Sequence, residues 1–135
     1  MLSDLRSYLE ADSTVDGLLD HATHGFRFYP DRIPDDTPYP VCRYAVIDES
    51  MFDTHGADTN KLNSDIIQID VWGRSAGEVR TIKDAIKDRL ASKHQVIQGN
   101  TRFGYIEWAG AFSTYESEVE LFRQAITINI TWSPV

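Results

Sequence analysis

Residues 65–90 change their hydrophobic period once, and this change constrains the fold more than any other feature of the chain. From Ile67 to Trp72 apolar residues alternate with period 2, which is typical of a strand with one buried face. Ser75 and Glu78 then form Ser-x-x-Glu, a capping box that satisfies backbone N–H groups where a helix begins. The next apolar residues recur three and four positions apart, as one helix face does: Val79, Ile82, Ile86 and Leu90. The pattern predicts a strand over 65–72 and an amphipathic helix over about 76–91.

The same patterns predict the remaining elements of one domain spanning 1–135. Apolar spacing over the first nineteen residues predicts two short helices that pack as a hairpin. Alternation of apolar and polar residues predicts further strands over 41–47, 95–98, 103–112 and 122–132. The expected fold class is α+β, with a twisted antiparallel sheet, the long amphipathic helix packed on one face, and the short N-terminal helical pair.

Two connections stand out between these elements. Residues 29–40 hold four of the five prolines and are expected to form an extended, semi-rigid connector. Residues 48–64 are polar and are interpreted as a loop, longer than a hairpin needs. Such a loop is either an ordinary mobile hairpin loop or a segment that becomes ordered against a partner. The candidate interface residues within it are Asp48, Glu49, Met51, Phe52, Asp53, His55 and Asp58.

The charge of the chain argues against nucleic-acid binding. The net charge is −8, and residues 1–64, with 12 acidic and 5 basic residues, contribute −7 of it. A protein that grips DNA normally shows a basic patch, because neutralising phosphates drives the affinity. Arg80, Lys83 and Lys87 line part of the long helix, but Asp84 and Asp88 interrupt them, which favours a solvated face. No apolar run is long enough to span a bilayer, so no membrane association is expected.

The residues that carry out chemistry are present but not arranged for it. Cys42 lies mid-strand with no histidine near it, so it is not expected to act as a nucleophile. His21 and His24 could share a helix face, but the end of a helix is favoured there over a metal site. Asp65 and Asp70 are interpreted as residues of solvated strand edges. The sequence therefore predicts no catalytic residue, no cofactor and no metal, and the chain is not expected to be an enzyme.

The order of these segments resembles the tail-completion, or tail-terminator, family of long-tailed phages and phage-like particles. The segments that carry the resemblance are Phe28–Arg32 with Tyr39-Pro40 and Val41, then Ile67–Trp72 with the helix Ala76–Leu90, and finally Phe122–Ile130. The resemblance implies a homo-oligomeric ring, six subunits by family likeness, that caps the tail tube and joins it to the neck of the head. The implied partners are other copies of the chain, a tail-tube protein and a neck or head-completion protein.

The same resemblance implies that DNA passes through the ring without specific binding, and that the protein is made in the host cytoplasm and resides in the virion. Two alternatives remain open at this point. The first is a neck or head-completion protein that contacts the portal side. The second belongs to another class, a small cytoplasmic α+β enzyme or ligand-binding domain with a site built from scattered carboxylates.

Overall fold

A computed structural model describes residues 1–52 and 62–135, and this part of the chain forms an α+β structure. The helices are α1 (Leu2–Glu10), α2 (Ser13–Leu19) and α3 (Ala76–Leu90). The strands are β1 (Asp20–His21), β2 (Gly25–Phe26), β3 (Phe28–Pro30), β4 (Val41–Phe52), β5 (Leu62–Gly73), β6 (Lys93–Gln98), β7 (Thr101–Glu116) and β8 (Leu121–Pro134). The predicted helices and the predicted strands are all present, although most strands are longer than expected.

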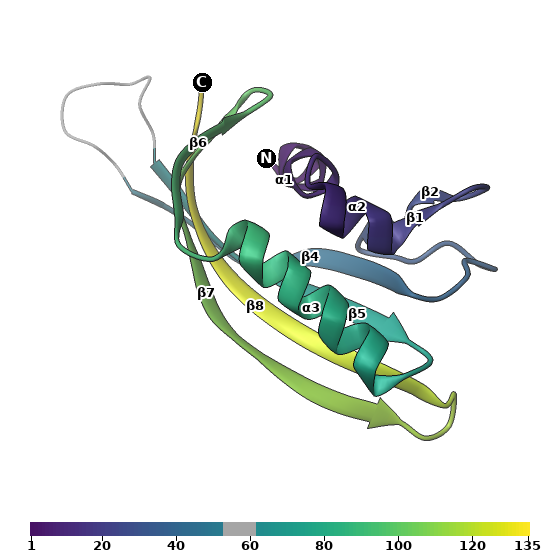
Figure 1. Ribbon diagram of the computed structural model, residues 1–135. Helices are drawn as coiled ribbons and strands as arrows, with labels where there is room; N and C mark the ends of the chain where they lie inside the picture. Colours follow the sequence, from purple (N-terminus) through teal and green to yellow (C-terminus); the bar gives the residue numbers. More distant parts are fainter. Residues whose placement is uncertain (53–61) are drawn as a thin grey trace.

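Six strands form one curled sheet in the order β3-β4-β5-β8-β7-β6, and β1 pairs with β2 in a separate short hairpin. Figure 1 shows that α1, α2 and α3 all lie on the concave side of this sheet. We call the opposite side, which no described helix covers, the outer face. Because side chains alternate along a strand, each strand contributes one set of residues to the core and one set to the outer face.

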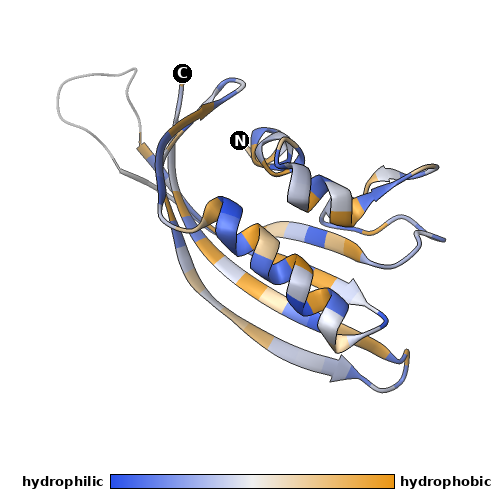
Figure 2. Cartoon of the chain, viewed as in Figure 1, coloured by the Kyte–Doolittle hydropathy of each residue, from blue (hydrophilic) through white to orange (hydrophobic). Residues whose placement is uncertain are grey.

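The helix α3 packs on the concave face against β5, β7 and β8. It begins after Ser75, whose hydroxyl accepts a hydrogen bond from the backbone N–H of Glu78 at 3.1 Å, as the capping box predicted. The residues that it buries are the predicted ones: Val79, Ile82, Ile86 and Leu90. Figure 2 shows hydrophilic residues along the side of α3 that faces away from the sheet. Full burial of each aliphatic side chain contributes roughly 1.5–3 kcal/mol to stability.

Arginine side chains tie the N-terminal helices to the neighbouring strands. Arg6 of α1 donates from Nε to the carbonyl of Phe28 and from Nη2 to that of Phe26, both at 3.0 Å. Arg27 is only 6% exposed and donates from Nε to the carbonyl of Leu19 at 2.9 Å. A guanidinium group can make such contacts because its planar set of N–H donors can bond to several backbone carbonyls at once while the group stays charged. The N-terminal segment is thereby fixed against the core without a disulfide.

The predicted loop 48–64 is wrong at both ends. β4 continues through Phe52 and β5 begins at Leu62, and these end residues pair with each other. A bulge between Val46 and Asp48 breaks the alternation on which the sequence analysis relied. Aspartate and asparagine, and to a lesser degree glutamate, are also depleted in strands, so a polar hairpin arm resembles a loop in sequence.

The prediction of a purely antiparallel sheet is wrong as well. β3 pairs in parallel with β4, with Phe28 opposite Cys42, because residues 31–40 carry the chain back before it enters β4. The sheet is therefore mixed, although all its other pairings are antiparallel. In α2 the N-cap is Asp12, and its carboxylate accepts hydrogen bonds from the backbone N–H groups of Thr14 and Val15.

Candidate functional site

The candidate interface residues fall on the hairpin that β4 and β5 form. Asp48 and Glu49 lie near the end of β4, and both are exposed. Met51 and Phe52 belong to β4 and pair with Asn63 and Leu62, so they are strand residues rather than loop residues. Asp53, His55 and Asp58 lie outside the described residues, and so does most of the predicted loop. Their assignment to an interface stays a prediction.

A hollow of about 320 Å³ opens beside Glu49 on the concave side of this hairpin. Its lining residues are Glu49, Ser50, Asn63, Asp65 and Trp132. Asp65 is only 6% exposed, and its Oδ2 accepts a hydrogen bond from the indole Nε1 of Trp132 at 3.0 Å. The two carboxylates make this end of the sheet acidic, and the buried one contradicts the interpretation of Asp65 as a residue of a solvated strand edge.

A second polar cluster lies on the outer face, where β4, β5 and β8 run side by side. Asp70 of β5 is at its centre, with a side chain only 2% exposed. Arg43 of β4 donates from Nη2 to its Oδ2 at 2.7 Å. Arg123 of β8 donates to Oδ1 from Nη2 at 2.7 Å and from Nε at 3.0 Å, and Gln68 donates to the same oxygen at 3.0 Å. The interpretation of Asp70 as a solvated edge residue is therefore wrong.

The surroundings of Asp70 keep its carboxylate ionised. Burial on its own would raise the pKa of Asp70, but hydrogen bonds from Gln68, Arg43 and Arg123, with the charge of Arg123, outweigh burial and lower the pKa. The guanidinium of Arg123 also lies 5.1 Å from the centre of the Trp72 ring. A carboxylate that accepts four N–H donors and has a lowered pKa is poorly suited to proton transfer near neutral pH. The cluster is therefore a structural ion network that cross-links three strands.

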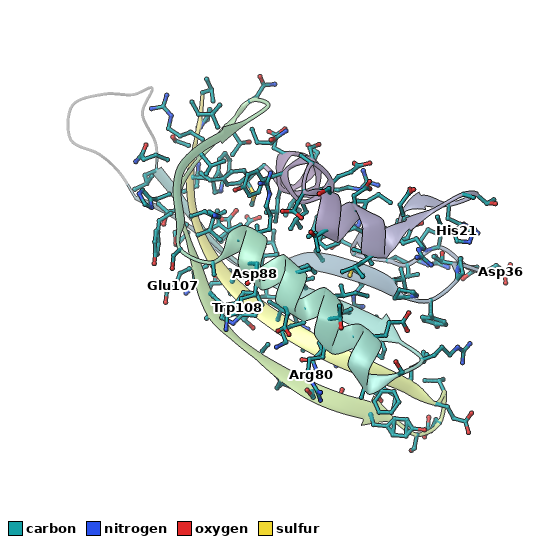
Figure 3. The ribbon with its side chains drawn as sticks, viewed as in Figure 1. His21, Asp36, Arg80, Asp88, Glu107 and Trp108 are labelled. Atoms are coloured by element: carbon teal, nitrogen blue, oxygen red, sulfur yellow. The ribbon has the colours of Figure 1, made fainter. Side chains whose placement is uncertain are left out.

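The histidines and the cysteine also have structural surroundings. The predicted helix end at His21 and His24 is instead the β1–β2 hairpin, where Nδ1 of His21 accepts the backbone N–H groups of Thr23 and His24. Figure 3 shows His21 at the far end of the molecule from β6. Cys42 is fully buried, and burial raises the pKa of its thiol. Within residues 1–52 and 62–135, histidine, cysteine and acidic residues form no group of three or more that could hold a metal ion.

Comparison with known proteins assigns the family. A sequence model described as "Tail completion protein gp17" matches residues 3–133, nearly the whole chain. The chain belongs to this tail-completion family. No curated protein sequence matches it. The fold is similar to that of a chain in the virion of a native gene transfer agent particle, with a TM-score of 0.70 and 14% sequence identity. That match covers 98% of this chain and 93% of the other.

Membership of the tail-completion family confirms the resemblance inferred from the sequence and gives the chain a structural role in the phage tail and its virion. The surfaces described above then become candidates for contacts with other virion proteins. None of the helices in the described part of the chain is both long enough and apolar enough to cross a membrane.

Sequence reasoning missed the Asp70 cluster, and the reason lies in the sheet register. Arg43 and Arg123 are 27 and 53 positions away from Asp70 in the chain, and only the pairing of β4 and β8 with β5 brings them together. One signal was available in the sequence. Asp70 interrupts an apolar strand, and an acidic residue there needs compensating partners if its face is not solvated.

Proposed function

We propose that this tail-completion protein forms a closed ring of identical subunits, six by family likeness, that caps the tail tube and joins it to the neck of the head. The family match over residues 3–133 carries the proposal. Its partners would be other copies of the chain, a tail-tube protein and a neck or head-completion protein. The ring would reside at the head–tail junction of the virion, after synthesis of the subunits in the host cytoplasm.

Rings of identical subunits use heterologous interfaces, in which one patch of a subunit contacts a different patch on the next subunit.

The charge of the protein supports the proposed role. A ring through which DNA travels should not hold the DNA, and a net charge of −8 repels phosphates over a distance of several ångströms in physiological salt. The protein would then act by geometry, by ending tube growth and offering a docking face to the neck.

Duplex DNA is expected not to bind the purified protein. In a gel-shift assay at about 150 mM salt, no complex should form at protein concentrations up to roughly 1 μM. Proteins that bind DNA without sequence specificity have dissociation constants of roughly 1–100 μM at physiological salt, and this acidic protein should bind no more tightly than they do. Lowering the salt should not reveal a complex, because the acidic surface gains repulsion rather than attraction as screening falls. A complex with sub-micromolar affinity would contradict the idea of a non-binding channel.

Loss of the protein tests the proposed function in the particle itself. Cells that lack this gene are expected to produce tails of uneven length that are not joined to heads, seen by electron microscopy of negatively stained lysates. Expression of the wild-type chain from a plasmid should restore uniform, joined particles and thereby control for effects on neighbouring genes. Normal particles without the protein would contradict the proposal.

The form of the defect also separates the two virion roles. A cap on the tube controls where the tube stops, so its loss should broaden the distribution of tail lengths. A neck or head-completion protein would leave tail length uniform while heads and tails stay apart. Tails of uniform length that are not joined to heads would therefore contradict the capping role and support the neck role.

A further inference from the structure

Two long strand edges are open at diagonally opposite corners of the sheet. β3 pairs only with Cys42 to Tyr44, so the outer edge of β4 from Ala45 to Phe52 has no strand beside it among the described residues. β6 pairs with β7 only as far as Ile106, so the described part of the chain also leaves the outer edge from Glu107 to Glu116 open. We call these the β4 edge and the β7 edge. They span eight and ten residues, so they are nearly equal in length.

The two outermost strands have several features that discourage pairing, whereas the β4 edge and the β7 edge lack most of these features. β3 is three residues long and ends in Pro30, and β6 begins with Lys93 and contains Gln95 at a φ of 55°. Short strands, proline, lysine and irregular backbone are the usual means of protecting an edge. The β4 edge and the β7 edge contain no proline, lysine or arginine, although each contains one bulge. Backbone N–H and C=O groups on an open edge can pair with a strand of another chain.

Pairing of each edge with its own copy would bring like charges together. A two-fold axis near the middle of the β4 edge places either Asp48 opposite Asp48 or Glu49 opposite Glu49 of the other copy, because residues directly opposite each other share a face. A two-fold axis through the middle of the β7 edge places Glu107 opposite Glu116. Like charges directly opposite each other destabilise strand pairs. The symmetric pairings are therefore disfavoured on both edges.

Pairing of the β4 edge with the β7 edge instead brings opposite charges together. Glu49 lies opposite Asp65, which is two residues before the core residue Ile67 in β5. Because side chains alternate along a strand, the side chain of Glu49 lies on the concave side of the sheet, as α3 does. Beside the β7 edge on that side, Lys87 of α3 has its Nζ 5.6 Å from the centre of the Trp108 ring. Figure 3 shows Arg80 on the side of α3 that faces β7. Asp84, which lies between these bases on α3, is paired with Lys83 at 2.6 Å, so an acidic edge still meets a strand flanked by net positive charge.

We propose that the β4 edge of one subunit pairs, antiparallel, with the β7 edge of the next subunit, so that the sheet continues from copy to copy around the ring. This inference rests on the proposed ring and names its interface. The direction follows from the topology, because β4 and β7 run in opposite directions within the sheet. The rotation that relates neighbouring subunits preserves these strand directions when it continues the sheet. The β4 edge of one subunit and the β7 edge of the next are therefore antiparallel.

The diagonal placement of the two edges agrees with closure. Glu49 lies in register with Asp65 and Ile130 near one end of the sheet, whereas Glu116 lies in register with Leu121 at the other end. Joining such edges staggers each subunit relative to the next along the strand direction. Closed sheets require this stagger, since their strands tilt by about 35–45° to the axis of closure.

A charge-swap series tests the interface, with native mass spectrometry of the purified chain alone and with its tail-tube protein as the readout. Reversing the acidic residue of the β4 edge that lies on the side of α3, with Glu49→Lys, should weaken self-association by roughly tenfold or more, because a basic side chain then meets basic side chains. Reversing the other side with Arg80→Glu and Lys87→Glu should weaken it similarly. Combining all three substitutions should restore association, because the attraction returns with its sign exchanged.

The controls separate this interface from general effects of charge and folding. Asp20→Lys changes the net charge as much as Glu49→Lys does, at an exposed residue away from both edges, and should leave association unchanged. All altered side chains are exposed, and circular dichroism at far-ultraviolet wavelengths should confirm that each variant is folded.

Each outcome then has one meaning. If wild-type chains associate but the reversals have no effect, or the combined variant stays dissociated, the interface is wrong while the ring remains. If wild-type chains remain single both alone and with the tube protein, the proposed ring fails, and this interface fails with it.

Discussion

Replacement of Ile82 by aspartate is expected to unfold the protein at 25 °C. Ile82 is 1% exposed and lies in the middle of the face that α3 packs against the sheet. The variant would lose roughly 1.5–3 kcal/mol of apolar burial and would also bury a carboxylate, which costs several kcal/mol without a partner. Domains of this size have total stabilities of about 5–15 kcal/mol. The far-ultraviolet circular dichroism spectrum should be that of an unfolded chain.

Two companion variants show whether burial is the cause. Ile82→Val removes one methylene group and should lower the free energy of unfolding by about 0.5–1.5 kcal/mol in urea titrations. Thr81→Asp introduces the same charge one position along, on an exposed part of α3, and should change stability by about 0.5 kcal/mol or less. A folded Ile82→Asp protein with an unchanged urea midpoint would contradict the assignment of this face to the core.

Replacement of Asp70 by alanine is expected to lower the free energy of unfolding by about 2–3 kcal/mol. Removing one partner of a buried ion pair costs about 3–5 kcal/mol, and the value here should be smaller because Arg43 is 39% exposed and keeps contact with water. Urea titration at pH 7 measures the loss. Asp35→Ala, on an 87% exposed side chain, is the matched control and should have almost no effect. Equal midpoints for the two variants would contradict the structural role of the cluster.

The pH dependence of stability gives an independent test of the same cluster. Because the folded pKa of Asp70 lies below its unfolded value of about 3.9, its stabilising contribution is complete above that value. The contribution is lost as the pH falls through the folded pKa. Wild-type protein should therefore lose more stability than Asp70→Asn between about pH 5 and pH 2, as measured by urea midpoints. Parallel curves for the two proteins would contradict a lowered pKa.

The sequence predicted those elements whose pattern reflects one buried face. α3 is an example, because Ser75 marks its start and its apolar residues recur with helical spacing down to Leu90. The core set of β5, from Ile67 to Val71, is another, because strict alternation leaves one register for the strand. In both cases local pattern and tertiary burial agree.

Elements that depend on a distant partner were not predicted. Residues 48–50 are polar, and the strand conformation of residues 48–52 comes from backbone pairing with residues 62–66. The parallel pairing of β3 depends on the path of residues 31–40, which proline content alone does not define. Arg89 is a similar case, because its Nε donates to the carbonyl of Tyr8, 81 positions away. Such contacts need a three-dimensional register that a single sequence does not contain.

The candidate interface residues were assigned to the wrong kind of element. Asp48 and Glu49 were selected as loop residues, and they are exposed but belong to a strand. That difference changes what they can do, since a strand offers an ordered row of backbone donors and acceptors whereas a loop does not. The β7 edge could not be selected at all, because its openness depends on where β6 stops pairing.

Cryo-electron microscopy of intact particles tests the central claim most directly, by locating this chain along the tail. The proposed function predicts one closed ring of copies at the end of the tail tube nearest the head, with the curled sheet of each copy fitting the density. Copies distributed along the whole tube, located in the head shell, or present singly at the junction would contradict a capping ring.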